Sequence, residues 1–166
     1  MAVDSAQKRR DRVQKWALRN IKLRLSRKLI FVAGLWACLS CELHPSPNLQ
    51  KARKANDRDG VSHEMTQFLA KFSQQSPLET LASAFLKYKA FDAARLSFGA
   101  YDHFLKILDT RSSREALEKL KHSDALNDPI FIRSKKNAQD FQEGLTALFF
   151  DTDKKLRRAT EIYGVF

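Results

Sequence analysis

The first 43 residues carry apolar side chains at helical spacing and contain no proline. Steps of three and four residues keep one apolar stripe on one side of a helix for more than seven turns. The stripe consists of Leu18, Ile21, Leu25, Leu29, Val32, Trp36, Leu39 and Leu43. The pattern predicts one long helix, or two collinear helices that meet near Ser26 or Gly34. Its second half is apolar nearly all round, so we expect other helices to enclose it.

A break follows this helix. Pro45 and Pro47 disfavour helical backbone at the residues before them, and neither can donate a backbone hydrogen bond. Residues 49–60 are polar and of mixed charge, and they end in Gly60. We therefore expect residues 44–61 to form a linker with at most one helical turn.

Signals for helix starts are dense from Ser62 onward. Ser76 and Glu79 form one capping box and Ser112 and Glu115 another, and Pro129 follows Asn127 and Asp128 as a helix start. A last helix is expected after residues 151–152, with a glycine at position 164 as its C-cap. Together these signals predict an all-α fold: about seven helices in one bundle, with residues 62–166 packing on residues 29–43.

Composition supports one domain, because 166 residues with 43% apolar side chains can bury a sizeable core. The net charge of +11 is unevenly distributed. Residues 1–28 hold ten lysines and arginines against two aspartates, whereas residues 29–166 hold twenty against seventeen acidic residues. The positive field therefore belongs to the N-terminal helix, and such a field attracts polyanions.

Five cations share a sector about 80° wide on the predicted helix. They are Lys8, Arg12, Lys15, Arg19 and Lys22. A row of cations on a rigid helix can meet phosphates at regular intervals, so we predict binding of a polyanion, most plausibly RNA or DNA. Anionic lipid and an acidic protein surface remain open as partners. Trp16 lies off the sector, and the residues show no clear aromatic interleaving of the kind that stacks unpaired bases.

Arg58 is followed by a polar residue, Asp59, and five positions after the arginine by His63. This spacing resembles the motif of HEPN-type ribonucleases, which are small helical domains. The resemblance implies cleavage of an RNA phosphodiester, with His63 moving a proton and Arg58 stabilising phosphate charge. Gly60 argues against the helical placement that the family shows, so a turn that leads into an N-cap is the competing interpretation.

Four side chains could ligate a metal: Cys38, Cys41, His44 and His63. His44 and His63 lack the close spacing of a second zinc knuckle, so we predict core cysteines and no metal or other cofactor. Two cysteines three positions apart favour a reducing compartment such as the cytoplasm. The uncharged run of residues 29–41 is shorter than a membrane span, which leaves a membrane-anchored form as a minor alternative.

The residues thus predict a non-catalytic helical binding module that engages nucleic acid through a basic N-terminal helix. The main alternative is a helical subunit that docks into a protein assembly. A membrane-associated protein and a HEPN-like ribonuclease are lesser alternatives, and no small-molecule substrate is indicated.

Overall fold

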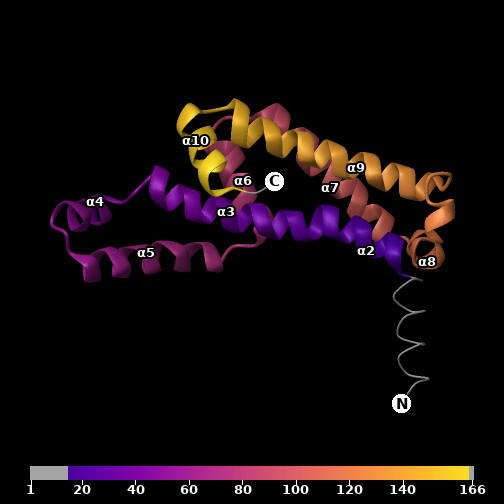
Figure 1. Ribbon diagram of the computed structural model, residues 1–166, viewed down its shortest axis with the longest axis horizontal. Helices are drawn as coiled ribbons and strands as arrows, with labels where there is room; N and C mark the ends of the chain where they lie inside the picture. Colours follow the sequence, from indigo (N-terminus) through magenta and orange to yellow (C-terminus); the bar gives the residue numbers. More distant parts are fainter. Residues whose placement is uncertain (1–14, 165–166) are drawn as a thin grey trace, which may run out of the picture. The chain divides into compact units, whose positions relative to one another are not determined.

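The computed structural model describes residues 15–164, which are helices and the turns between them (Figure 1). Within that range there is no strand, which confirms the predicted all-α class. The expected long first helix is continuous from Trp16 to Leu43. Residues 1–14 lie outside the described range, so the predicted start of this helix does too.

The chain divides into two compact units. Unit 1 contains the described residues 15–28 and Arg95–Leu145, and unit 2 contains Leu29–Ala94 and the described residues 146–164. The sequence passes between the two units three times, after residues 28, 94 and 145, and each time it does so within a helical segment. The residues expected to pack together, 29–43 and 62–166, are therefore distributed over both units.

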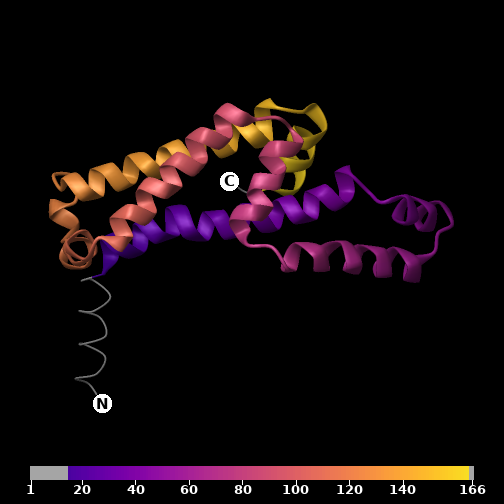
Figure 2. The same cartoon turned by 180° about the vertical axis from the view of Figure 1, so that it is seen from behind.

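Unit 1 is a small bundle in which α7 and α9 lie side by side in both views (Figures 1 and 2). The rings of Tyr101 and Phe141 are 5.8 Å apart, and the buried hydroxyl of Ser97 donates to the backbone oxygen of Phe141. The start of α2 packs on α8. The helical elements are α2 (Trp16–Lys22), η1 (Leu23–Arg27), α7 (Phe91–Asp109, from Arg95 on), α8 (Arg111–Lys119), η2 (His122–Asp124) and α9 (Pro129–Thr146). The largest fully buried side chains of this unit are Ile21, Leu25, Phe104, Leu117, Phe141 and Leu145.

Unit 2 is built around the apolar part of the long helix. Trp36 is buried there, and its indole N–H donates to the Ser83 hydroxyl at 3.0 Å, which satisfies its one polar atom. The helical elements are α3 (Lys28–Leu43, from Leu29 on), α4 (Pro47–Lys54), α5 (Arg58–Ser73), α6 (Pro77–Lys87), η3 (Ala147–Asp151) and α10 (Lys154–Tyr163). The core includes Leu49, Leu81, Phe85, Leu148, Phe149 and Leu156.

Several predicted helix boundaries are confirmed. The Ser76–Glu79 capping box forms with both of its hydrogen bonds, and Asp128 accepts from the backbone N–H of Phe131 at 2.7 Å. Gly164 is the C-cap of α10. The capping box expected at Ser112 was wrong: the N-cap of α8 is Thr110, two residues earlier, and it makes no side-chain cap bond.

The expected linker contains a helix. Ser46 caps α4 by accepting from the backbone N–H of Leu49 at 3.0 Å, and Pro47 occupies the first helical position. The Ser46 hydroxyl also donates to Glu64 of α5 at 3.0 Å. α4 packs on α5 and lies near the beginning of α5 in both views (Figures 1 and 2), so residues 47–54 form a packed helix rather than an irregular linker.

The expectation that other helices enclose the apolar end of the long helix was wrong for one face of α3. Ile30 is 61% exposed and Phe31 is 46% exposed, and Gly34 and Cys38 are exposed beside them. Both cysteines were predicted to be core residues: Cys41 is buried, but Cys38 is exposed, so the prediction was wrong for Cys38. Hydrophobic composition therefore predicted the helix but not which of its faces is covered.

No single helix in the described range combines the length and apolar character of a membrane span. The helices Trp16–Leu43 and Pro47–Lys54 meet at an angle of 61°. Taken together, this bent pair has the length and apolar composition of a membrane span.

Candidate nucleic-acid interface

All charged residues in the described part of the N-terminal basic segment are cations. Residues 15–28 hold six lysines and arginines and no aspartate or glutamate. They are Lys15, Arg19, Lys22, Arg24, Arg27 and Lys28. Of the five cations predicted to share a sector, Lys8 and Arg12 lie outside the described residues.

The other three predicted cations stand on the outer side of α2. Lys15, Arg19 and Lys22 are all exposed, whereas Leu18 and Ile21 are buried on the opposite side. Spacings of four and three residues place successive cations above one another on a helix. The described structure thus keeps these three charges together and in solvent.

These charges have no neutralising carboxylate in the described part of the chain. In residues 15–164, neither Lys15, Arg19 nor Lys22 is in an ion pair. The ion pairs that do form join other residues, such as Arg53 with Glu42 at 2.7 Å. An uncompensated row of cations is the arrangement that attracts an external polyanion.

The next turn of the helix is wider than an α-helical turn. Leu23–Arg27 form a π-helix, whose hydrogen bonds run from residue i to residue i+5. Because this turn takes more residues, Arg27, five positions after Lys22, comes closer to the side on which Lys22 stands. Lys28 is different: its ammonium donates to the Gln142 side chain, and burial followed by the charge of Arg24 lowers its pKa.

A shallow depression of about 590 Å³ lies over this surface of unit 1. We call it the cationic depression. The described residues that line it are Trp16, Arg19, Asn20, Lys22, Leu23, Ser26 and Arg27. It combines three guanidinium or ammonium groups with an indole, an exposed leucine and two uncharged polar side chains.

Trp16 is fixed at one end of the cationic depression. Its ring lies 4.5 Å from the His122 ring and 5.4 Å from the Phe131 ring, measured between centroids. The residue remains partly exposed, although those two contacts anchor it to η2 and α9. The indole is therefore held in one position, and the residue as a whole stays partly accessible to solvent.

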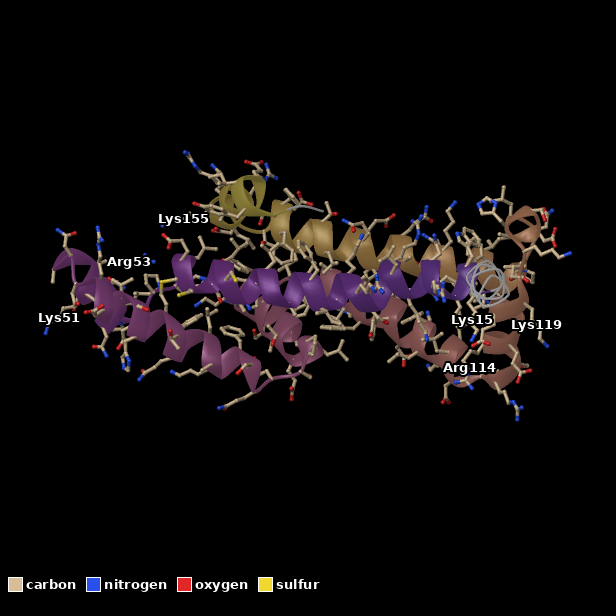
Figure 3. The ribbon with its side chains drawn as sticks, turned by 60° about the horizontal axis from the view of Figure 1, so that its bottom comes forward. Lys15, Lys51, Arg53, Arg114, Lys119 and Lys155 are labelled. Carbon is tan, nitrogen blue, oxygen red and sulfur yellow. The ribbon has the colours of Figure 1, made fainter. Side chains whose placement is uncertain are left out.

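Further cations lie where α2 meets α8. Figure 3 shows Lys15 at the start of α2, and Arg114 and Lys119 on α8, all in unit 1. All three are exposed. The labelled cations Lys51, Arg53 and Lys155 belong to unit 2, and Arg53 is already paired with Glu42.

The charge of the described residues differs between the two units. Unit 1 has fifteen lysines and arginines against eight acidic residues, a balance of +7. Unit 2 has eleven against nine, a balance of +2. The excess in unit 1 comes almost entirely from residues 15–28.

Arg58 and His63 both lie in α5, so the expectation that Gly60 would keep them out of a helix was wrong. The carboxylate of Asp57 accepts from the Gly60 backbone N–H at 2.9 Å and caps the helix. A Cβ on residue 60 would stand 2.3 Å from a carboxylate oxygen of Asp57, so a side chain there would have to displace the capping carboxylate. Arg58 lines a small depression that His63 does not line, while His63 contacts Gln67 at 2.8 Å.

The structure does not bring the four candidate metal ligands together. Cys38 and His44 are exposed, Cys41 is buried, and His63 is on α5. No group of three or more histidine, cysteine, aspartate or glutamate side chains in the described range could hold a metal ion. His44 instead contacts the Tyr88 hydroxyl at 3.3 Å, and burial followed by the charge of Lys87 lowers the pKa of His44.

Two residues of the cationic depression were missed by the sequence pattern. Arg27 falls outside the predicted sector because that sector assumes 100° per residue, which the π-turn does not keep. Trp16 was not included in the predicted site because, at 100° per residue, it lies about 40° beyond the edge of the cationic sector. The sequence did contain a signal for a larger site, because residues 15–28 hold six cations and no acidic residue.

Comparison of the chain with protein-family models, with curated proteins and with solved structures finds no match.

Proposed function

We propose that this protein is a helical module that binds nucleic acid through Lys15, Arg19, Lys22 and Arg27 on the outer side of α2 and η1. The observation that carries the proposal is that the three predicted cations are exposed, adjacent and without a carboxylate partner in residues 15–164. Arginine and lysine contacts to phosphates release condensed counterions, and this release drives association at low salt.

The test compares two triple variants of equal charge. The first replaces Lys15, Arg19 and Lys22 with glutamine, and the second replaces Lys51, Lys54 and Lys155, which are exposed cations of unit 2. Binding of the full chain to labelled mixed-sequence RNA and DNA is measured by fluorescence anisotropy. We expect the first variant to bind about tenfold more weakly at moderate salt, because it loses three phosphate contacts.

The second variant controls for net charge, because it carries the same total. If nonspecific attraction to the whole molecule were responsible, both variants would lose affinity equally. A first variant that binds like the wild type would rule out α2 as the contact surface. Adding Lys8→Gln and Arg12→Gln to the first variant then tests the remaining cations of the predicted sector.

A second candidate function is docking into a protein assembly through the long helix of this chain. The observation that favours it is the exposed apolar face of α3 in unit 2, where a depression of about 660 Å³ is lined by Ile30, Phe31, Leu35 and Tyr163. Large exposed apolar patches commonly mark interaction sites. Co-purification in high salt separates the two functions, since an apolar interface survives conditions in which phosphate contacts weaken.

A further inference from the structure

We infer that the cationic depression is built for an unpaired nucleic-acid strand, with a base seated against Trp16 and Leu23 and the phosphates on Arg19, Lys22 and Arg27. This inference rests on the proposed function and narrows it to one class of nucleic acid. A duplex buries its base faces in its own stack, so a protein needs only cations to hold it. An unpaired strand offers base faces as well, and proteins that bind one combine cations with aromatic platforms.

The depression has both parts. Trp16 and Leu23 are seven positions apart, which is two helical turns, so they stand on one side of the helix. Leu23 is 51% exposed although it is apolar. The three cations line the same depression as these two apolar groups. A surface that served only to prevent aggregation, or to attract any polyanion, would not need an exposed leucine beside a partly exposed tryptophan.

The indole is also preorganised. The contacts of Trp16 with His122 and Phe131 hold it in place before any ligand arrives, so little side-chain freedom is lost on binding. A volume of about 590 Å³ falls within the range of small-ligand pockets, about 300–1,000 Å³, and accommodates a nucleotide.

Tryptophan fluorescence tests the stack directly. The chain has two tryptophans, and Trp36 is only 3% exposed, so it is shielded from a bound strand. Full-length protein is titrated with oligo(U), with oligo(dT) and with a mixed-sequence duplex DNA of equal length. We expect the two single strands to quench the fluorescence and the duplex to leave it unchanged. In Trp16→Phe, which keeps an aromatic ring against His122 and Phe131, the quenching should disappear.

Affinity measurements separate stacking from charge. Leu23→Ser removes an exposed apolar contact without touching the core, and we expect it to weaken single-strand binding about fivefold, which corresponds to about 1 kcal/mol of binding free energy. The slope of log K against log salt should stay unchanged, because that slope counts phosphates. Arg27→Gln should instead reduce the magnitude of this negative slope by about 0.7 on a single strand, because one phosphate contact is lost.

Each outcome bears on a separate statement. Salt-dependent binding of duplex and single strands with equal affinity and no quenching overturns the unpaired-strand inference and leaves nucleic-acid binding intact. Absence of binding to all three probes at low salt overturns the proposed function itself, and the inference with it. Preference for the single strands, with quenching lost in Trp16→Phe, supports both.

Discussion

Glu79 shows how a single exposed side chain fixes the start of a helix. Its carboxylate accepts from the Ser76 backbone N–H at 2.7 Å, while the Ser76 hydroxyl accepts from the Glu79 backbone N–H at 3.2 Å. The bond from the Ser76 backbone, followed by that from its side chain, lowers the pKa of Glu79. The ionised form is therefore the one that the folded chain stabilises.

This pKa sets the sign of a pH dependence. Because the folded pKa lies below the unfolded value, the stabilisation is present above the ordinary glutamate range and is lost as pH falls through the folded pKa. We expect Glu79→Gln to be less stable than the wild type at neutral pH, and the difference to disappear at a pH acidic enough to protonate Glu79 in the folded chain. Urea unfolding at both pH values measures it. Glu161→Gln, an exposed acid on α10 without a cap bond, should show no such loss.

Asp57 supplies a second prediction, at the start of α5. Its side chain satisfies the Gly60 backbone N–H, one of the unpaired donors of the first turn. Asp57→Ala should lower the free energy of unfolding by about 1 kcal/mol, the usual cost of losing an N-cap. Asp57→Asn keeps an acceptor oxygen and should retain most of the stability in the same denaturation assay. Equal losses in the two variants would mean that the cap bond contributes nothing.

The two caps also show what local sequence predicts. Ser76, Pro77 and Glu79 were recognised because the whole device lies within four residues and needs no tertiary contact. Asp57 was overlooked because Gly60 was taken as a helix breaker. Glycine is only mildly unfavourable in a helix, and here the cap carboxylate occupies the space that a Cβ would need.

At the scale of elements, α2 depends on Trp16 for its attachment to the rest of unit 1. The indole packs on rings from η2 and α9, elements more than 100 positions later in the chain. Periodicity predicted that Trp16 belonged to a helix, but it could not predict partners so distant in sequence. The same limit applies to α3, whose apolar residues were recognised while their exposed face was not.

Removal of the indole should therefore loosen unit 1. We expect Trp16→Ala to lower the free energy of unfolding by about 2 kcal/mol, less than the 3–5 kcal/mol typical of a fully buried aromatic residue, because Trp16 is only partly buried. Trp16→Phe retains a ring and should lose less. Amide hydrogen exchange of Trp16–Lys22 provides the local measurement, and unchanged exchange in Trp16→Ala would contradict the anchoring role.

For the molecule as a whole, the uneven distribution of charge could be predicted from the sequence, but the set of residues that form the cationic depression could not. Counting lysines and arginines along the sequence placed the excess before residue 29, and the described residues keep it in unit 1. The π-turn of η1 is a local widening that a fixed helical period does not contain, so the contribution of Arg27 needed coordinates.

The salt dependence of binding should report that asymmetry. Four cations on α2 and η1 that each meet a phosphate predict a slope of log K against log salt near −3 on a single strand, at about 0.7 per phosphate. Replacing Lys15, Arg19 and Lys22 should bring the slope to about −0.7, whereas replacing Lys51, Lys54 and Lys155 should leave it near −3. A slope that falls equally in both variants would show that the ligand contacts the two units alike. A partner retained at high salt with no slope would favour the docking function, because apolar burial releases no counterions.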